Sequence, residues 1–408
     1  MIRILHTSDW HLGRTLHDKK RYDESESFLN WLAELVEKEK TDLLLVAGDV
    51  FDSSTPGNRA QELYYGFLAR IKETGCRHIV ITGGNHDSPT LLDAPRNLLG
   101  ALHIKVVGAV TGTTGDEIYP VRDESGNLEA IVCAVPFLRD RDIRTVEPGE
   151  RPDDKTRKLR EGIARHYREV YEEAIKLQNG DKKVPVIGMG HLFTSDAVTT
   201  EGDGVRELYI GSAVHVEEKD ISGGFDYMAL GHLHMAQAAG TNEKARYSGS
   251  PFPMGFGEAG QKKKVVIVRF EGDSPAISEH DIPCFRELMK ITGNLDEIIA
   301  RIEELKDDGS DAWLEIEVTS RTDASVITSH LDELLKGSQL EVLRTRNSSI
   351  VRALSPVSGN ETLETLDDRE VFRRCLEAFE VKAEEHEELL KTYDDAIRSM
   401  QTNDINAE

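Results

Sequence analysis

Five apolar runs that each lead into a small residue and then acidic, amide or imidazole side chains constrain this sequence most. The endings are Asp9-Trp10-His11, Gly48-Asp49-Val50-Phe51-Asp52, Gly84-Asn85-His86-Asp87, Gly190-His191 and Gly231-His232-Leu233-His234. Because ligands of α/β sheets bind beyond the carboxyl ends of strands, five such endings can meet in one crevice. A single ending would be weak, since an isolated histidine at a strand end is more often structural. Together and in this order, they predict one polar site.

Short apolar runs alternate with amphipathic stretches over residues 1–280, which indicates an α/β domain. Strands are expected at Ile2–His6, Asp42–Ala47 and Arg77–Thr82, with helices at Glu24–Lys38 and Arg59–Thr74 between them. A charged surface helix is expected at Pro152–Leu177, followed by strands of a second sheet at Val184–Gly188, Phe225–Leu230, Ala245–Ser248 and Lys264–Phe270.

The pattern changes after residue 280. Residues 281–346 alternate apolar runs with two helical stretches and predict a small α+β domain, and residues 347–365 read as a linker. Residues 366–408 predict a charged helical tail, whose apolar stripe suits docking onto a helix of another protein. A tail that packs weakly on its own chain is the alternative. The stripe consists of Val371, Phe372, Leu376, Phe379, Leu389 and Leu390.

Composition excludes several classes of protein. Apolar residues make up 38% and charged residues 30% of the 408 residues, and no apolar run approaches the roughly 18 residues of a membrane helix. The N-terminus lacks a secretory signal, so a cytoplasmic location is expected. The four cysteines have no metal-site spacing. The net charge of −24 opposes unaided nucleic-acid binding, unless bound cations or a basic partner supply the attraction.

The strand endings provide enough donors for two divalent cations. Asp49 could bridge the two ions, so that each ion has four ligands. Asp9 and His11 are two apart and would project to the same side of a strand. Carboxylate, amide and imidazole donors without thiolate suit manganese, iron or zinc. The seven candidates are Asp9, His11, Asp49, Asn85, His191, His232 and His234.

Two adjacent ions favour hydrolysis of a phosphate ester, because they can clamp the phosphate and activate water. His86 directly follows the candidate ligand Asn85 and could protonate the leaving oxygen. Asp52 is expected to hydrogen-bond to His86 and keep it cationic. Asp87 is expected to cap a helix that begins near Ser88-Pro89.

The endings resemble the calcineurin-like metallophosphoesterase signature, D-x-H…GD-x-x-D…GNH[DE]…GH…GH-x-H. This resemblance implies a four-layer αββα sandwich. The segments ILHTSDWHLG, VAGDVFD, GNHDSPTLLDAPRNLL, VPFLRDRDIRT, YIGS, DYMALGHLH and YSGSP look like the SbcD family within that superfamily, along nearly the whole chain.

The resemblance also implies roles for individual residues. Asp9, His11, Asp49 and His234 would hold one metal, and Asp49, Asn85, His191 and His232 the other. His86 matches the catalytic histidine, whereas position 52 can be His in archaeal and eukaryotic relatives. Residues 281–346 would form a capping domain that helps to admit DNA.

The resemblance also implies two divalent ions, which we expect to be Mn²⁺, and a partner for the tail: the coiled-coil base of SbcC, an SMC-like ATPase. The two subunits would act as a dimer of each on DNA ends and hairpins. The implied activities are ATP-independent single-strand endonuclease action, and ATP-dependent 3′-to-5′ double-strand exonuclease action and hairpin opening.

Three alternatives stay open. Phosphoprotein phosphatases of this superfamily carry an arginine where this chain has Ser53, which argues against a phosphomonoesterase. A small-nucleotide phosphodiesterase would leave the extra domain and tail without a purpose. A subunit that only tethers DNA ends would not need all seven donors. Basic residues that could contact DNA, or be ordinary surface charge, are Arg14, Lys19, Lys20, Arg21, Arg139, Arg141 and Arg144.

Overall fold

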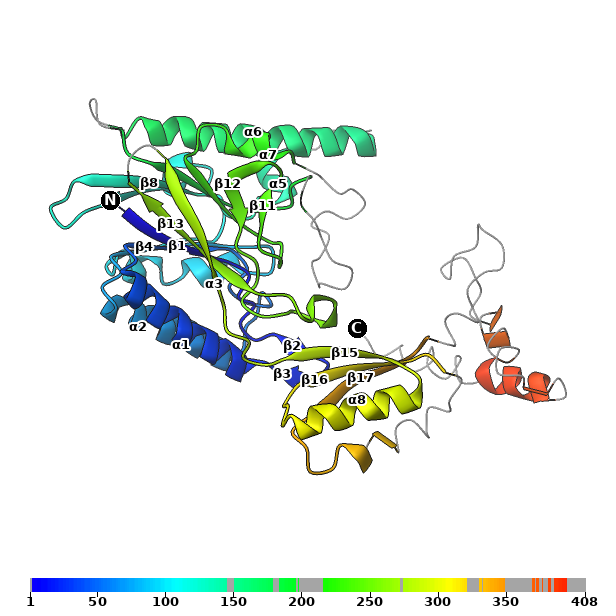
Figure 1. Cartoon of the computed structure of the whole chain (residues 1–408). Helices are drawn as coiled ribbons and strands as arrows, with labels where there is room; N and C mark the ends of the chain where they lie inside the picture. Colours follow the sequence, from blue (N-terminus) through cyan, green and yellow to red (C-terminus); the bar gives the residue numbers. More distant parts are fainter. Residues whose placement is uncertain are drawn as a thin grey trace. The chain divides into compact units, whose positions relative to one another are not determined.

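The computed structural model divides into two compact units, Met1–Glu287 and Leu288–Glu408 (Figure 1). The residues that the structure describes are 2–144, 150–178, 183–195, 197, 216–271, 274–320, 330–331, 333–348, 369–370, 372–373, 376, 381–382 and 385–394.

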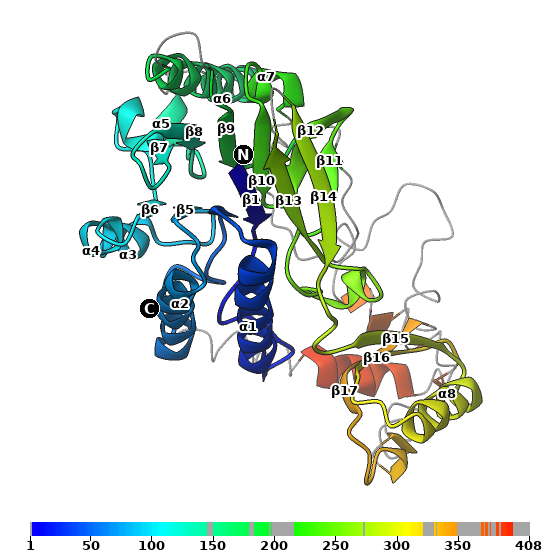
Figure 2. The ribbon, with the colours of Figure 1, turned by 60° about the vertical axis from the view of Figure 1, so that its left-hand side comes forward.

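Two six-stranded sheets form the centre of the first unit (Figure 2). Across the first sheet the order is β14 (Pro275–Asp281), β13 (Lys264–Phe270), β1 (Ile2–Thr7), β4 (Leu43–Ala47), β5 (His78–Thr82) and β6 (Ile104–Val107). Across the second it is β11 (Gln237–Ala239), β12 (Asn242–Tyr247), β10 (Tyr227–Gly231), β9 (Val186–His191), β8 (Leu128–Ala134) and β7 (Ile118–Arg122). The strands that carry candidate ligands run parallel to one another within each sheet: β1, β4 and β5 in one sheet, β9 and β10 in the other.

Helices and short turns surround the sheets. The longer helices are α1 (Tyr22–Glu39), α2 (Asn58–Glu73) and α6 (Pro152–Ile175). The shorter ones are α3 (Pro89–Asp93), α4 (Arg96–Gly100), α5 (Asp140–Ile143), α7 (Glu218–Ser222), η1 (Thr114–Glu117) and η2 (Phe256–Glu258), and a hairpin is formed by β2 (Thr15–Leu16) and β3 (Lys19–Lys20).

Three apolar clusters separate four layers. One joins α1 and α2 to the first sheet, a second lies between the two sheets, and a third joins the second sheet to α6 and α7. All five residues of β4 are buried; Leu44 belongs to the helix-facing cluster, whereas Leu43 and Leu45 face the other sheet. The four-layer αββα fold is therefore confirmed, with α6 above and α1 below the sheets in Figure 1.

Lys264–Phe270 was expected in the second sheet, and this assignment was wrong. The run does form a strand, β13, but it pairs antiparallel with β1 of the first sheet, with Ile2 opposite Phe270. Both sheets offer an apolar inner face and a helix-covered or solvent-exposed outer face. The apolar pattern of a strand therefore does not reveal which sheet it joins.

The second unit contains a three-stranded parallel sheet and one long helix. Its order is β15 (Leu288–Gly293), β16 (Trp313–Val318) and β17 (Glu341–Asn347), with α8 (Leu295–Asp307) between the first two strands in the chain. Asn294 caps α8: its Oδ1 accepts from Glu297 N at 3.0 Å, and the Glu297 carboxylate accepts from Asn294 N at 2.8 Å. Ile298 and Ile302 of α8 pack on the sheet.

Part of the expected apolar stripe packs within this unit. Phe372 stacks on Tyr393, with ring centroids 4.3 Å apart, and Leu376 is only 6% exposed. Leu389 and Leu390 are half-buried. Val371 and Phe379 lie outside the described residues, as does the linker region 347–365 apart from residues 347 and 348. Among the helices that the structure describes, none combines the length and apolar character required to cross a membrane.

His6 links the two sheets and should make the stability of the first unit depend on pH. Its Nδ1 lies 3.0 Å from the Tyr227 hydroxyl, and burial lowers the pKa of His6 from 6.5 to about 3, aided by the charge of Arg246. Between these pH values the unfolded chain binds a proton that the folded chain does not. Stability should therefore fall by about 1.4 kcal/mol per unit as the pH drops from 6.5 towards 3 through this residue.

Urea unfolding of metal-free protein at pH 5 and 7 would measure this effect. His6→Gln should lose less stability on acidification than the wild type. Equal pH slopes for the wild type and His6→Gln would contradict the assignment.

Candidate metal centre

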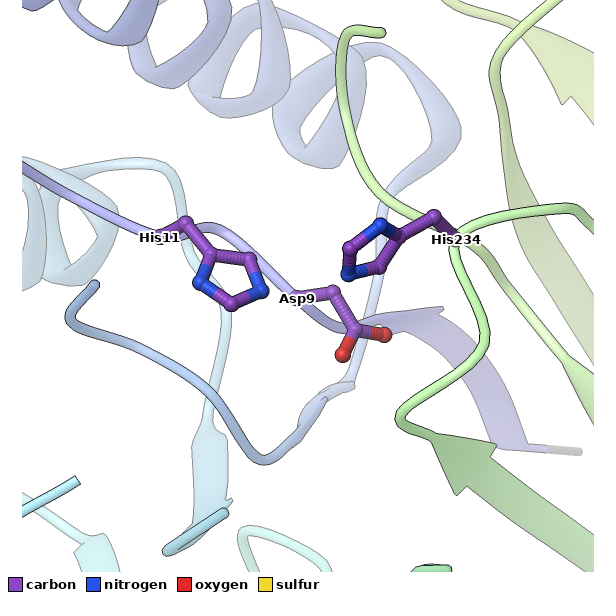
Figure 3. A group of neighbouring side chains, drawn as sticks. All are labelled: Asp9, His11 and His234. Atoms are coloured by element: carbon purple, nitrogen blue, oxygen red, sulfur yellow. The ribbon is translucent and has the colours of Figure 1, made fainter. Parts of the chain in front are cut away.

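The candidate ligands meet at the carboxyl ends of five strands from both sheets. Six of them form two groups in which the ligand atoms lie within 4.8 Å of one another, and His11, Asp52 and His86 form a third such group. We call Asp9, His11 and His234 the Asp9 cluster, and Asp49, His191 and His232 the Asp49 cluster. Figure 3 shows the three side chains of the Asp9 cluster pointing toward one another. All six residues are buried.

Asp49 belongs to the Asp49 cluster and also reaches His11 of the Asp9 cluster. Its Oδ2 is 3.6 Å from Nε2 of His11 and 3.3 Å from Nε2 of His191. Asn85 joins the second cluster, because its Oδ1 lies 3.0 Å from the same nitrogen of His191. The other oxygen of Asp49 accepts from His86 N at 2.9 Å, which fixes the carboxylate plane. Asp49 is therefore placed to bridge two cations.

The expected reason for the pairing of Asp9 with His11 was wrong. Strand β1 ends at Thr7, so both residues lie beyond it, and their φ values are +53° and +44°. Asp49 and His232 also have positive φ, at +49° and +100°. Residues other than glycine rarely adopt positive φ values, and backbone strain of this kind concentrates at functional sites. Left-handed turns, rather than strand alternation, aim these side chains.

Glycines next to the ligands allow the loops to approach closely. A Cβ on Gly48 would lie 2.2 Å from Nδ1 of His191, and one on Gly84 would lie 2.1 Å from Oδ1 of Asp49. A Cβ on Gly231 would lie 1.9 Å from the carbonyl oxygen of Ala47. The glycine in each of these endings is therefore a packing requirement of the centre.

Two of the histidines have the nitrogen remote from the centre held by an acceptor. His191 Nδ1 donates to the Ala47 carbonyl oxygen at 2.9 Å, and His234 Nδ1 lies 3.0 Å from Oε1 of Glu258. An acceptor at Nδ1 keeps the proton there and leaves the lone pair on Nε2, as metal-binding histidines require.

The pKa values of Asp49 and of the neighbouring histidines depend on one another. Burial acts to raise the pKa of Asp49, but the adjacent histidines, with His191 foremost, hold that pKa well below its ordinary value. Burial acts to lower the pKa of His191, but Asp49 raises it to about 9. The proton on His191 thus balances the buried carboxylate of Asp49 in the metal-free protein, whereas burial lowers the pKa of His232 well below its ordinary value. A bound cation would replace this positive charge and release protons.

The residues fit divalent cations. His11 is 2% exposed, and its Nε2 has no hydrogen bond within the described part of the chain, whereas Nδ1 faces the Asp52 carboxylate at 3.2 Å. An unpaired buried polar atom is costly, and a cation beside Nε2 would remove that cost. The surrounding donors are carboxylate, amide and imidazole groups, which suit manganese, iron or zinc.

His86 and Asp52 meet differently from the expectation. Nδ1 of His86 donates to the main-chain carbonyl of Asp52 at 2.8 Å. The Asp52 carboxylate instead accepts from Arg14 Nη1 at 3.0 Å and lies 3.2 Å from Nδ1 of His11. Asp52 therefore contacts His86 through its main-chain carbonyl, and its carboxylate contacts Arg14 and His11 instead.

Asp87 has a structural role other than the expected helix cap. Ser88 caps α3, accepting from Leu91 N at 3.4 Å. Asp87 accepts main-chain hydrogen bonds from Val50 at 3.1 Å, Phe51 at 2.9 Å and Gly84 at 2.9 Å. It thereby joins the loop after β4 to the loop after β5.

Several basic residues expected to contact DNA already have protein partners. Arg21 is 1% exposed, pairs with Glu24 and lies over the Phe252 ring, so it is structural. Arg144 is also largely covered and pairs with Asp140 and Glu150. The separation of exposed from buried arginine could not be derived from sequence.

Other members of that set stay closer to solvent. Arg14 is partly exposed and is engaged by Asp52, whereas Lys19, Lys20 and Arg141 are exposed. Arg139 is half-buried. Lys19 and Lys20 form β3, at the turn that follows the first two ligands.

Glu258 and Lys263 were missed by the sequence analysis. Burial acts to raise the pKa of Glu258, but the hydrogen bond with His234 and the charge of Lys263 lower it to about 2. No spacing links these residues to the G-H-x-H ending, since Glu258 lies on the short turn η2 well downstream. Its relation to His234 emerges only from the fold.

The fold and this centre are those of a phosphate-ester hydrolase with divalent cations. Residues 2–236 match the family model described as calcineurin-like phosphoesterase, and residues 284–379 match the one described as Type 5 capsule protein repressor C-terminal domain.

Curated relatives refine this class. The chain is 36% identical to the SbcD subunit of the nuclease SbcCD from Escherichia coli (strain K12) over 98% of both chains. It is 34% identical to the protein of that name from Rhodobacter capsulatus, covering 74% of this chain and 76% of the relative. It is 31% identical to the protein of that name from Bacillus subtilis, covering 78% of this chain and 79% of the relative. The chain belongs to this SbcD family of calcineurin-like phosphoesterases.

Gly84→Ala should disrupt the centre without unfolding the protein. The added Cβ would meet Asp49 at Oδ1 and, at 2.3 Å, at its main-chain nitrogen, so the shared carboxylate must move. We expect Mn²⁺ affinity to fall by at least about 10-fold. Gly66→Ala is the matched control, because its Cβ meets nothing within 4 Å. Calorimetric titration would measure both variants, and wild-type affinity in Gly84→Ala would reject the packing argument.

Proposed function

We propose that this chain is a metal-dependent DNA nuclease that cleaves phosphodiester bonds at DNA ends and in hairpins. The observation that carries the proposal is Asp49, which reaches histidines of both clusters of metal-ligating side chains, in a chain whose relatives are nuclease subunits along almost their whole length. Asp9, His11, Asp49 and His234 would hold one ion. Asp49, Asn85, His191 and His232 would hold the other.

The ions, when bound, supply a clamp for the phosphate, an activated water at neutral pH and stabilisation of the developing charge. The chain's own residues supply position and protons. Asp49 fixes the spacing of the two clusters, and its second oxygen holds the His86 backbone. His86 has its Nδ1 proton on the Asp52 carbonyl, so Nε2 can deliver a proton to the leaving oxygen.

A diester substrate is favoured over a monoester. Phosphoprotein phosphatases of this superfamily grip the terminal phosphate dianion with an arginine at the position of Ser53. Arg14 is an arginine near this position, but it is engaged by the Asp52 carboxylate and by the Met254 carbonyl at 3.4 Å. Position 53 therefore has no arginine to bind a phosphate monoester, and Arg14 is already held by other groups.

Manganese is the proposed ion, on the donor set and the family resemblance. We propose that the partner is an SMC-like ATPase of the SbcC type, which binds the helical tail of this chain. The complex would have ATP-dependent 3′-to-5′ double-strand exonuclease and hairpin-opening activities. Single-strand endonuclease activity would need no ATP. The assembly would contain a homodimer of this chain within a heterotetramer, with residues 281–346 as a capping domain. Because the proposed substrate is DNA and the relatives are bacterial nuclease subunits, we place the protein in the cytoplasm.

His86→Ala should abolish cleavage and leave metal binding intact. Loss of a general acid typically reduces turnover by about 10²–10⁴-fold. Cleavage of single-stranded DNA, a hairpin and para-nitrophenyl phosphate would be followed with Mn²⁺, alone and with the ATPase partner and ATP. DNA cleavage that is lost in the variant, with little monoester turnover, supports the nuclease. Monoester turnover without DNA cleavage in any mixture would identify a phosphatase instead, and loss of both ions in His86→Ala would reject its catalytic role.

Lys19 and Lys20 are the proposed phosphate contacts nearest to the centre. Replacing both with Gln should weaken binding to DNA of any sequence and reduce the slope of log affinity against log salt by about 0.9 for each duplex phosphate that is no longer neutralised. Lys38→Gln/Lys40→Gln is the charge-matched control, because these exposed residues lie at the other end of α1. Fluorescence anisotropy at several salt concentrations would test this, and an unchanged slope would reject the proposed role of the two lysines.

A further inference from the structure

A buried ion pair lies behind the imidazole of His234. Glu258 is 1% exposed and Lys263 is 5% exposed. Oε1 of Glu258 lies 3.0 Å from Nδ1 of His234, while Oε2 contacts the Lys263 ammonium and accepts from Met254 N at 3.1 Å. Burying a carboxylate without a cation beside it destabilises the fold, so Lys263 permits Glu258 to remain ionised there.

Lys263 also holds the backbone of the same histidine. Its Nζ donates to the His234 carbonyl oxygen at 2.9 Å and lies 3.1 Å from the Ser250 hydroxyl. Ser250 N donates to that carbonyl at 3.1 Å. The imidazole and the main chain of His234 are thus fixed by one connected network.

The segment that carries Glu258 is anchored by the loop after the first ligands. The guanidinium of Arg21 lies 4.5 Å from the Phe252 ring centroid and donates to the Pro253 carbonyl. His17 stacks on Phe256 with centroids 5.9 Å apart. These contacts restrict motion of Glu258, and a restricted acceptor orients a metal ligand more effectively.

His191 in the Asp49 cluster has a weaker acceptor. Its Nδ1 donates to the neutral Ala47 carbonyl, whereas His234 has an ionised carboxylate at the corresponding position. Hydrogen bonds to ionised acceptors are stronger, and they increase the basicity of the histidine as a ligand. The two clusters should therefore differ in affinity for the same ion.

We propose that Glu258 and Lys263 are positioning residues that make the Asp9 cluster the tighter of two cation sites, so that it fills before the Asp49 cluster. The inference rests on the proposed two-ion function, because it assumes that both clusters bind metal. It adds an order of loading and two residues outside the ligand set.

Mn²⁺ titration of EDTA-stripped full-length protein would test this, with free Mn²⁺ measured by electron paramagnetic resonance. The wild type should bind two ions in two steps. His191→Asn should retain the tighter step, and His234→Asn should lose it. Glu258→Gln should weaken the tighter step by about 10–100-fold and leave the weaker step within about twofold.

Matched variants separate positioning from general stability. Glu258→Asp keeps the charge but shortens the reach to His234, so it should also weaken the tighter step. Glu279→Gln is the control, because Glu279 likewise pairs with a lysine, Lys264, but lies on β14. It should bind both ions as the wild type does. Thermal unfolding of each metal-free variant would verify that it folds.

Three outcomes would overturn the inference: a tight step retained in His234→Asn, an unchanged tight step in folded Glu258→Gln, or equal weakening of both steps in that variant. If Glu258→Gln does not fold, Glu258→Asp decides the role of Glu258, and His234→Asn decides which cluster is tighter. Ordered binding of two ions without DNA cleavage would leave this inference standing and reject the nuclease. Failure of the wild type to bind two ions would reject the two-ion centre and this inference with it.

Discussion

The Asp49 carboxylate, reached by histidines from both sheets, is the interaction on which the arrangement of the centre depends. Strand β4 delivers Asp49 from the middle of the first sheet, while His191 comes from the second sheet. His11 reaches the same oxygen from the loop after β1. The inner apolar cluster fixes the distance between the sheets, and so it also fixes the distance between these donors. The geometry of the ligands in this fold therefore depends on the packing of the core between the sheets.

Gathering so many donors in a buried place requires backbone conformations that the chain would otherwise avoid. Asp9, His11 and Asp49 all have positive φ, which costs on the order of 1–3 kcal/mol at each residue. Hydrogen bonds between loops offset part of this cost. His11 N donates to the Asp49 carbonyl, and Asp87 accepts from three main-chain amides. A bound cation would add further stabilisation by satisfying the donors that face one another.

Apolar periodicity predicted an α/β domain with two sheets, and the family resemblance predicted the four layers. The polar strand endings, which are a local signal, pointed to residues that the fold brings close together. The sequence could not assign β13 to its sheet, since an apolar strand fits either one. It could not distinguish buried Arg21 from exposed Lys20, because both follow the same loop. The role of Glu258 could not be predicted from the sequence for another reason. Its contact with His234 depends on how a turn far along the chain folds back. Long-range partners of ligands leave no spacing in the chain.

The net charge of −24 acquires a physical meaning from this geometry. A DNA backbone approaching such a chain meets overall repulsion, which the exposed lysines of β3 offset only locally. Two divalent cations would reverse the sign of the potential where the scissile phosphate must sit. Metal loading would then control both chemistry and substrate approach, because an empty centre repels the group that a filled centre attracts. In a proposed complex with an ATPase, a basic surface on the partner would extend that attraction along the DNA and leave the local potential at the cleavage site to the ions.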